Sequence, residues 1–440
     1  MKKNLLLSFC ISALTITSIN AQTWTPAGTW VNSSIECLKS FNGKLFVGGN
    51  FTGVGTNTWN CNFNAQWDGS TLTPYYDANL GGLDFNCFEI HNSTLYVGGA
   101  FNIGSFGPKE VAVWDGTSWD DPTGAYQLNS NVYAMASFGG KLYMGGYFTT
   151  YNSVNYNHVA SNSGSGYSTV GSGFDATVMA LAVYNGALYA GGGFTNSGTT
   201  AVNHIAKWNG TSWQQVGTGV NGTVSGMAVM GTDLYVIGSF TLAGSTTVKD
   251  IAKWNGTIWS DVGGGLSGGF NGIRAVISYN NYLYVGGDFT TAGSISAKNV
   301  AAWNGSSWFA LGNGITNSVN ALEIYNNALY AGPFSFANDT NYVWKFSSLA
   351  GVNETTAEKG FTVNASYNSY SNAIQLNIES EMYSKFSFML YDMLGKNVAN
   401  ADVVTGANAI NIGFTPNGIY NCEVSSEKGK STTKVFVLKQ

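Results

Sequence analysis

Alternating apolar and polar residues fill much of this chain, and one alternating stretch returns seven times. Its first copy is Leu45-Phe46-Val47-Gly48-Gly49-Asn50-Phe51, which we call the glycine motif, and the other copies begin at Leu95, Leu142, Leu188, Leu234, Leu283 and Leu329. Successive copies begin 46 to 50 residues apart. Alternation with a period of two is the pattern of β-strands, and a fixed period of this length predicts a repeat architecture.

Each repeat unit is predicted to hold four short strands. In four units the glycine motif is followed by Trp-Asn/Asp-Gly-x-x-Trp, starting at Trp114, Trp208, Trp254 and Trp303. Asn-Gly or Asp-Gly between apolar runs predicts a tight hairpin, since both residues accept a positive φ. Another alternating run precedes each motif, as at Val319–Tyr325. Four-stranded sheets repeated around an axis form a β-propeller, which protects its sheet edges by closure.

The two ends of the repeat region predict how the ring closes. Residues 23–29 match the fourth-strand sequence at 212–218, whereas the seventh unit stops after its third strand at Trp344–Phe346. We therefore expect an all-β chain in which residues 22–346 form a seven-bladed β-propeller. Its N-terminal strand, which includes Trp24, is expected to complete the last blade.

Composition supports this fold and narrows the class of ligand. Of 440 residues 57 are glycine and 6 proline, and 14% are aromatic but only 10% charged, a balance that favours strands and turns. The net charge is −5, and Arg274 is the single arginine. The chain therefore has no basic surface for nucleic acid, and we expect no nucleic-acid partner.

The N-terminus has the pattern of a signal peptide over residues 1–21. Lys2 and Lys3 precede a largely apolar stretch at residues 5–19, and Ala21 supplies a small residue before the expected cut. The apolar stretch is too short for a membrane span, and we expect no transmembrane segment.

A second all-β sequence follows the repeats. Residues 347–360 are polar and without pattern, which is typical of a linker. From Phe361 to the end, alternating runs such as those at residues 374–378, 386–391 and 434–439 predict a small β-sandwich over residues 361–440.

Residues 361–440 resemble the type A C-terminal sorting domain of the type IX secretion system of Bacteroidetes. The resemblance rests on residues 390–396, then 417–420, then 429–430 with the final strand 434–439. Its motif positions are Gly395, Lys396, Gly418, Tyr420, Lys434 and Lys439. It implies transport through the periplasm to the outer cell surface or the medium, with the type IX machinery and its sortase-like peptidase as partners. The chain departs from the family at residues 361–365, where the family has a Tyr-Pro-Asn-Pro-like opening.

The repeat region, residues 23–346, is similar to kelch-type, galactose-oxidase-like and Rax-type propeller repeats. This resemblance supports the fold and implies no activity, since propellers have many unrelated functions. An oxidase copper site needs converging histidine and tyrosine ligands, and the chain has only His91, His158 and His204. His158 and His204 share one repeat position, so we expect a structural role for them, no metal and no cofactor.

Two apparent catalytic motifs are explained by turns. Residues 265–269 fit the nucleophile-elbow pattern and residues 217–222 fit the dinucleotide fingerprint. Both patterns require a helix, and both stretches lie at the same repeat position between predicted blades.

Four cysteines follow the signal peptide. Cys37 and Cys87 replace alanines of other units and are expected to be small buried residues. Whether these two form a disulfide is an open question at this point.

Charged residues on the innermost strands are the candidates for chemistry in the central channel. Glu89 and Glu323 align with Lys39, and Arg274 lies on another innermost strand. A carboxylate pair is what glycoside hydrolysis requires, so these glutamates are weak catalytic candidates. The alternative, solvated channel residues without catalytic function, is favoured.

Aromatic residues outside the repeat pattern are the candidates for a ligand surface. Exposed aromatic faces stack on sugars and bind partner proteins. The aromatic candidates come from the first three units and are Trp59, Tyr75, Tyr76, Phe85, Tyr151 and Tyr156. Arg274, on a later inner strand, is a further candidate for ligand binding.

These observations predict a secreted or surface-displayed binding protein whose ligand is a glycan or a protein, and we favour binding over catalysis. One alternative is a secreted hydrolase or lyase that acts on polysaccharide in the propeller channel. Another is a structural component of the cell surface.

Overall fold

The structure is a computed structural model, and it divides the chain into two compact units, Met1–Leu349 and Ala350–Gln440. The described part of the chain is all-β and contains no helix. The predicted signal peptide and linker lie outside it. The described residues are 23–55, 61–76, 80–103, 108–122, 128–164, 166–335, 341–346, 361–368, 373–380, 385–391, 397–412, 418–426 and 430–437.

The described residues of the first unit form seven four-stranded antiparallel sheets. The first strand of each sheet, which we call the inner strand, is β2 (Ile35–Phe41), β6 (Leu80–His91), β10 (Val132–Phe138), β16 (Val178–Tyr184), β22 (Thr223–Met230), β29 (Ile273–Tyr279) or β35 (Val319–Tyr325). The second strands, which contain the glycine motif, are β3 (Lys44–Gly49), β7 (Thr94–Ile103), β11 (Lys141–Gly146), β17 (Ala187–Gly192), β23 (Asp233–Ser239), β30 (Tyr282–Gly287) and β36 (Ala328–Pro333).

The two outer strands of each sheet are shorter. The third strands are β4 (Asn64–Trp67), β8 (Pro108–Trp114), β14 (Val159–Asn162), β20 (Ile205–Trp208), β26 (Ile251–Trp254), β33 (Val300–Trp303) and β37 (Trp344–Phe346). The fourth are β5 (Leu72–Pro74), β9 (Trp119–Asp120), β15 (Tyr167–Thr169), β21 (Trp213–Gln215), β27 (Trp259–Asp261), β34 (Trp308–Ala310) and β1 (Trp24–Pro26).

Short extra strands join the second and third strands of several sheets. Three pairs are β12 (Thr150–Tyr151) with β13 (Val154–Asn155), β18 (Asn196–Ser197) with β19 (Thr200–Ala201), and β24 (Leu242–Ala243) with β25 (Thr246–Thr247). A three-stranded sheet contains a fourth such pair, β31 (Thr291–Ala292) and β32 (Ile295–Ser296), together with β28 (Leu266–Ser267), which precedes the inner strand β29.

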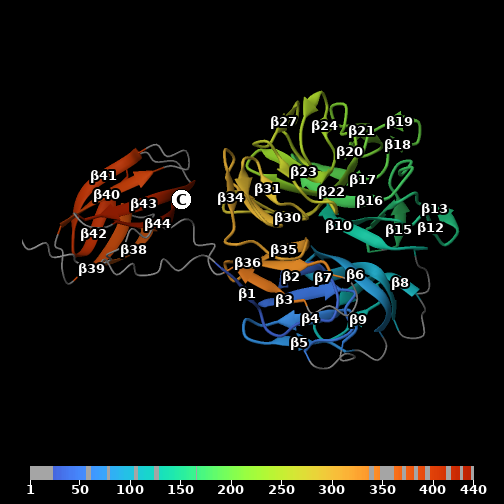
Figure 1. The fold of residues 1–440 in the computed structure, drawn as a ribbon, viewed down its shortest axis with the longest axis horizontal. Helices are drawn as coiled ribbons and strands as arrows, with labels where there is room; N and C mark the ends of the chain where they lie inside the picture. The colour runs from blue at the N-terminus through green and yellow to red at the C-terminus, as the bar shows by residue number, and fades with distance from the viewer. Residues whose placement is uncertain are drawn as a thin grey trace, which may run out of the picture. The chain divides into compact units, whose positions relative to one another are not determined.

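The inner strands contact one another in a closed circle. Each contacts the inner strand of the next sheet along the chain, from β2 to β6 and so on to β35, and β35 contacts β2. In Figure 1 these strands lie toward the middle of the first unit, and outer strands such as β5 and β27 lie toward its rim. The seven sheets therefore form a ring.

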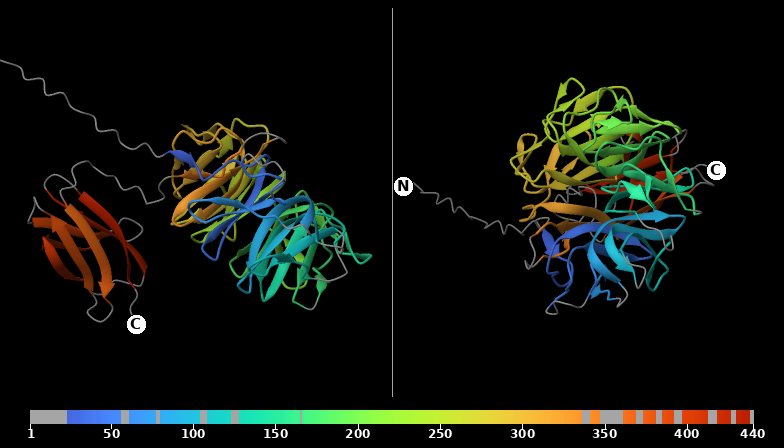
Figure 2. Two further views of the ribbon diagram at one scale, coloured as in Figure 1. Left: turned by 90° about the horizontal axis from the view of Figure 1, so that it is seen from below. Right: turned by 90° about the vertical axis from the view of Figure 1, so that its right-hand side faces the viewer.

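The N-terminal strand is part of the last sheet of the ring, as its sequence predicts. β1 pairs with β37 in the register Trp24 to Phe346 and Pro26 to Trp344. Figure 2 shows this blue strand beside the orange strands that come from the C-terminal end of the first unit's sequence. The ring is thus closed by hydrogen bonds between the two ends of the repeat region.

Fourth-strand tryptophans join neighbouring sheets. The indole nitrogen of Trp213 donates a hydrogen bond of 3.1 Å to the carbonyl oxygen of Val170, in the preceding repeat. Trp259 and Trp308 make the same bond to Val216 and Val262, at 3.2 and 2.9 Å. In three of the four hairpin motifs the second tryptophan thus satisfies a buried indole N–H at an inter-sheet contact, whereas the indole N–H of Trp119 has no hydrogen-bond partner among the described residues.

The two glycines of the motif have different steric functions. A Cβ atom on Gly145 would overlap Val178 on the inner strand of the next sheet, so the first glycine permits close packing between sheets. A Cβ atom on Gly146 would overlap the carbonyl oxygen of Asn131, so the second permits close approach within its own sheet. Neither position requires a positive φ, and the constraint is close approach.

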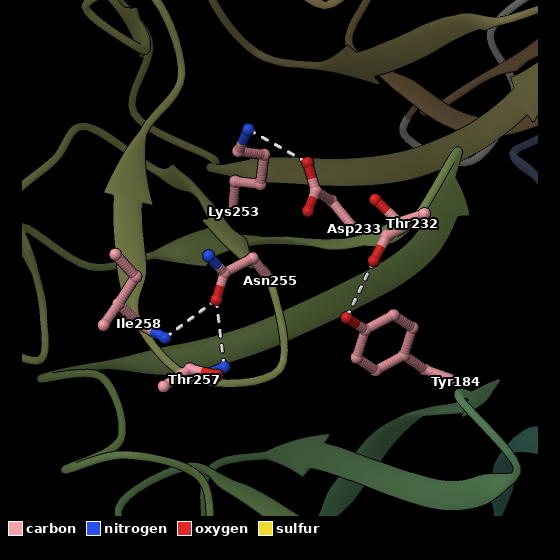
Figure 3. Close-up of polar contacts among 7 residues, drawn as sticks. All are labelled: Tyr184, Thr232, Asp233, Lys253, Asn255, Thr257 and Ile258. Atoms are coloured by element: carbon pink, nitrogen blue, oxygen red, sulfur yellow. Dashed lines mark hydrogen bonds and ion pairs between the residues drawn. The ribbon is translucent and has the colours of Figure 1, made fainter.

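Figure 3 shows one hairpin turn and one contact between neighbouring sheets at the level of single residues. In the Asn-Gly hairpin after β26, the Oδ1 atom of Asn255 accepts hydrogen bonds of 2.9 Å from the backbone N–H groups of Thr257 and Ile258. This is an Asx turn, which fixes the hairpin locally. The hydroxyl of Tyr184, at the end of β16, donates a 2.8 Å hydrogen bond to the carbonyl oxygen of Thr232 in the next sheet.

The second unit contains two antiparallel sheets with one shared core. One sheet has the order β38 (Phe361–Asn368), β39 (Ala373–Ser380), β42 (Gly406–Asn411), and the other has the order β41 (Asn397–Val404), β40 (Lys385–Tyr391), β43 (Gly418–Ser425), β44 (Lys430–Val437). Ile374, Leu376 and Ile378 from the first sheet pack with Phe388 and Val424 from the second. Alternating strand residues thus meet in a core between the sheets.

Candidate functional site

Six inner strands of the ring have a β-bulge near their start, and the longer strand β6 has two, the second at Asn86. The pairing of β29 with β30, for example, shifts between Ile273 and Ala275, so Arg274 is the extra residue. A bulge redirects a side chain out of the regular pleat, and bulges are frequent beside functional sites. We call the end of the ring where the inner strands begin the bulge mouth. Its bulged residues are Glu36, Asn86, Tyr133, Met179, Ser225, Arg274 and Asn320.

The bulged residues interact across neighbouring sheets. The amide nitrogen of Asn320 donates a 2.7 Å hydrogen bond to a carboxylate oxygen of Glu36. Burial raises the pKa of Glu36, while the Asn320 hydrogen bond and the positive charge of Arg274 oppose this change. The guanidinium of Arg274 lies 5.5 Å from the centre of the Phe334 ring, a cation–π distance. The bulge mouth therefore has a connected polar surface that contains the only arginine of the chain.

Exposed aromatic and apolar side chains lie at the same mouth. Tyr147 directly follows β11, its backbone N–H bonds to Asn131 beside the start of β10, and its side chain is 60% exposed. Phe270 is fully exposed in the loop before β29, and the bulged Met179 is also exposed. Exposed aromatic side chains next to hydrogen-bonding groups are a common basis for ligand recognition.

A cleft of about 570 Å³ lies beside Tyr147, between the third and fourth sheets. Its other lining residues are mostly polar, namely Asn129, Ser130, Thr149, His158, Asp175, Ala176 and Thr177. Burial lowers the pKa of His158, and its Nδ1 atom lies 3.2 Å from the carbonyl oxygen of Gly146. Since a carbonyl only accepts, Nδ1 holds the proton of the neutral ring and Nε2 is an acceptor.

The predicted channel glutamates lie on both sides of a lysine. Glu323, Lys39 and Glu89 occur on β35, β2 and β6, whose order in the ring makes them neighbours. Burial raises the pKa of Glu323 to about 7 and also raises the pKa of Glu89, while the charge of Lys39 opposes both changes. A carboxyl group that titrates near neutral pH suits general acid catalysis, and the same groups also suit a balanced, partly buried charge cluster.

The structure corrects two of the predicted ligand-binding aromatics. Phe85 is fully buried and packs against Phe101 and Trp119, because it points into the core between the first and second sheets. Tyr156 is buried too, and its hydroxyl donates to the carbonyl oxygen of Tyr167. Neither residue has the exposed face on which its prediction depended.

The other predicted aromatics have mixed environments. Tyr75 packs against Trp114 and donates a hydrogen bond to the carbonyl oxygen of Thr117. Tyr151 packs against Tyr167 with ring centroids 4.6 Å apart. Tyr76 is 62% exposed, and Trp59 lies outside the described residues. Among the predicted ligand residues that the structure describes, Arg274 is itself a bulged residue of an inner strand.

Sequence reasoning missed Tyr147 and Phe270. The sixth position of the glycine motif, directly after its two glycine positions, varies more than its neighbours. Its residues in the seven copies are Asn50, Ala100, Tyr147, Gly193, Ser239, Asp288 and Phe334. For Tyr147, variation at one position within an otherwise repeated motif is the available signal, whereas Phe270 lies outside the motif. This variation marks side chains at one end of the ring that the fold leaves unconstrained.

Histidine and cysteine residues have structural environments. His158 and His204 both adopt a positive φ before the third strand, and the Nδ1 atoms lie 3.2 and 3.3 Å from the carbonyl oxygens of Gly146 and Gly192. Cys37 is directed toward the carbonyl oxygen of Phe85, whereas Cys87 is close to Gly98 of its own sheet. Among the described residues, no three His, Cys, Asp or Glu side chains are grouped to hold a metal ion.

The sorting-motif residues lie in the second unit. Gly418 and Lys434 are on the paired strands β43 and β44, and Tyr420 is buried in the shared core. Gly395, Lys396 and Lys439 lie outside the described residues. No helix in the described ranges has the length and apolar character needed to cross a membrane.

Comparisons with known proteins identify the second unit. Two solved structures are similar to the chain. The computationally designed Ika8 protein has 13% identity and a TM-score of 0.45, and the match covers 73% of this chain and 99% of that chain. PorZ, described as an essential bacterial surface component of the type-IX secretion system of Porphyromonas gingivalis, has 14% identity and a TM-score of 0.44, and the match covers 92% of this chain. The chain spans 60% of the length of PorZ. No curated protein matches the chain. Residues 371–439 match the secretion system C-terminal sorting domain, and the protein is therefore one that the type IX system delivers to the cell surface or the extracellular space.

Proposed function

We propose that the first unit is a seven-bladed β-propeller that binds a glycan at its bulge mouth, and that the second unit is a β-sandwich used for export. Residues 1–21 would direct the chain to the periplasm, and residues 361–440 would engage the type IX machinery and its sortase-like peptidase. The ring of seven four-stranded sheets supports the blade count. The kelch-like character of the repeats remains a prediction.

The observation that carries the binding function is the cleft beside Tyr147. An exposed aromatic ring borders a cleft lined by hydroxyl, amide, carboxylate and imidazole groups. A pyranose ring has an apolar face that stacks on an aromatic side chain, and its hydroxyl groups require donors and acceptors around that face. The surface thus combines the two features that a sugar needs.

A glycan array probed with the full mature chain tests this function. Binding to one or more glycans that Tyr147→Ala weakens at least tenfold would support it. The variant Phe309→Ala is a matched control, because Phe309 is an exposed aromatic residue on the fourth strand β34. Equal loss in both variants, or binding to protein ligands only, would contradict a glycan site at this mouth.

The runner-up function is hydrolysis or cleavage of polysaccharide in the channel. It is supported by the pKa of Glu323, which burial raises to about 7, and by the neighbouring Glu89. Release of reducing ends from a polysaccharide, abolished by Glu323→Gln or Glu89→Gln, would favour this function. Binding without any cleavage would favour the glycan-binding propeller.

A further inference from the structure

A buried lysine–aspartate pair lies in the second sheet. The Nζ atom of Lys109 is 2.8 Å from Oδ2 of Asp121, and their side chains are only 2% and 5% exposed. Lys109 is near the start of β8, and Asp121 directly follows β9, the fourth strand of the same sheet. Removing two charges from water costs several kcal/mol per ion, so a pair buried this deeply requires an explanation.

A third buried ionisable group lies beside this pair. Glu110 is 6% exposed, follows Lys109 in β8, and lies where the pairing of β7 with β8 is irregular, between Gly98 and Phe101. Burial raises the pKa of Glu110 to about 8, while the charge of Lys109 opposes this change and the charge of Asp121 adds to it. Glu110 is therefore mostly protonated at neutral pH and interacts electrostatically with both partners.

Apolar and aromatic residues lie on one side of the cluster. Val111, Leu128, Met135 and Tyr156 form the adjoining core, and Tyr151 and Tyr167 pack against it. Burial raises the pKa of the Tyr167 hydroxyl well above its usual range, and the nearby charges of Glu110 and Asp121 add to this effect. The side chains of Lys109 and Asp121 are thus almost completely removed from solvent, which strengthens the direct contact between them.

We propose that Lys109 and Asp121 form an intramolecular isopeptide bond, with Glu110 as the proton relay. The geometry already places the amine at contact distance from the carboxyl group. Proximity of this kind replaces a bimolecular encounter and removes much of the entropic barrier. The bond would be a covalent modification made by the chain itself, independent of ligand binding at the bulge mouth.

The reaction balances without an oxidant or cofactor. A proton passes from the Lys109 ammonium to the Asp121 carboxylate, which makes both groups neutral. The amine lone pair then attacks Cγ of Asp121, and Glu110 donates a proton to the oxygen that will leave while its carboxylate takes one from the attacking nitrogen. The C–O bond breaks, one water molecule leaves, an amide bond remains, and Glu110 is again protonated.

Such a bond would fasten the outer edge of the second sheet. β9 has only two residues, Trp119 and Asp120, and it is the fourth strand of its sheet. A short edge strand opens easily, and an open edge exposes unpaired backbone groups. A covalent link from Asp121 to Lys109 would hold the hairpin closed in the extracellular space.

Mass spectrometry of the full mature chain tests the proposal. The bond makes the protein lighter than its sequence mass by one water, and it blocks trypsin after Lys109. Because the next cleavage sites are Lys44 and Lys141, the digest should contain one peptide of residues 45–141 that lacks one water. The sequence mass, with separate peptides 45–109 and 110–141, would overturn the proposal.

The chain supplies its own control. Lys253 and Asp233 form an ion pair of 2.9 Å, nearly the same distance, but their side chains are 32% and 20% exposed (Figure 3). Trypsin should cleave normally after Lys253. A water-loss adduct at this solvated pair would show that the signal is an artefact, and would overturn the argument from burial.

Two variants test the roles of the residues. Lys109→Arg keeps the charge but removes the reacting amine, and it should restore the sequence mass. Glu110→Gln should leave at least tenfold less of the linked form after purification, with circular dichroism like that of the wild type. Complete bond formation in Glu110→Gln would overturn the role of Glu110. Because the wild-type digest is decisive by itself, a variant that fails to fold does not remove the test.

Discussion

The indole nitrogen of Trp24 donates a hydrogen bond of 2.9 Å to the carbonyl oxygen of Leu311, which lies 287 residues further along the chain. Trp308 makes the same bond to Val262, and Trp259 makes it to Val216. The N-terminal strand therefore repeats the inter-sheet contact of an ordinary fourth strand. A residue of the first described strand thus connects the last sheet to the sheet before it.

Substituting Trp24 should weaken closure of the ring. Trp24→Ala removes this hydrogen bond and the packing against Phe346, whose ring centroid is 5.0 Å away. Because Trp24 is only partly buried, we expect a loss of about 2 kcal/mol in the free energy of unfolding, measured in urea. Phe309→Ala, at an exposed outer position, should cost less than about 0.5 kcal/mol. Equal effects of the two substitutions would contradict this account of closure.

The fifth repeat offers a test of the glycine motif. Ile237 replaces the first motif glycine there, and its partner across the pair is Gly226, where the fourth repeat has Gly191 opposite Ala180. A Cβ atom on Gly226 would lie 3.0 Å from Ile237, so Gly226→Ala alone should cost about 1 kcal/mol.

When both residues are exchanged, the steric cost of Gly226→Ala should disappear, because the Ile237 side chain is no longer there to overlap the new Cβ atom. The double variant Gly226→Ala with Ile237→Gly recreates the arrangement of the fourth repeat. Urea unfolding should therefore show a coupling of about 1 kcal/mol between the two substitutions. Strictly additive losses would mean that the pair is not sterically linked.

Much of the fold of the first unit was predictable because its determinants are local and repeated. The hairpin at Asn255 and the glycine pair at Gly145 are each specified by a few neighbouring residues, and the sequence states them several times. The bulges were not predicted, because a bulge depends on the register between two strands. The position of Arg274 at a mouth therefore became clear only with the pairing of β29 and β30.

The channel carboxyl groups predict a pH dependence of stability. The pKa of Glu323 is about 7 in the folded ring, raised by burial from its ordinary value of 4.5, so the folded state binds this proton more tightly. Its stabilising contribution is complete below pH 4.5 and declines as the pH rises through 7.

Glu323→Gln should flatten that decline. Between pH 5 and pH 8 we expect the wild-type free energy of unfolding to fall by about 1 to 2 kcal/mol more than that of the variant, a discounted value because the side chain is partly solvated. Chemical denaturation at the two pH values measures this difference. Parallel pH profiles for the two proteins would contradict the raised pKa.

Export should depend on the second unit. Deletion of residues 361–440 removes every strand of that unit, including β43 and β44, which contain Gly418 and Lys434. We expect the shortened protein to accumulate in the periplasm, as measured by cell fractionation and immunoblotting. Unchanged release into the medium or onto the surface would show that another segment is sufficient for export.

The candidate site was predicted less well than the fold. The departure of Phe85 from the repeat predicts an exposed residue, yet the long inner strand β6 directs it into the core. Tyr147 was missed because its position is defined by the ring, where the end of β11 meets the start of β10. Exposure at a mouth is a tertiary property, and a strand pattern indicates only which face a residue takes.

Equilibrium binding of a glycan selected on the array tests the central claim most directly. The dissociation constant would be measured by calorimetry for the wild type and for Tyr147→Ala, Arg274→Ala and Phe309→Ala, after confirming that all four unfold at similar denaturant concentrations. Binding at the bulge mouth predicts at least a tenfold weaker affinity for Tyr147→Ala, a smaller loss for Arg274→Ala and no change for Phe309→Ala. Wild-type affinity in Tyr147→Ala would contradict the account.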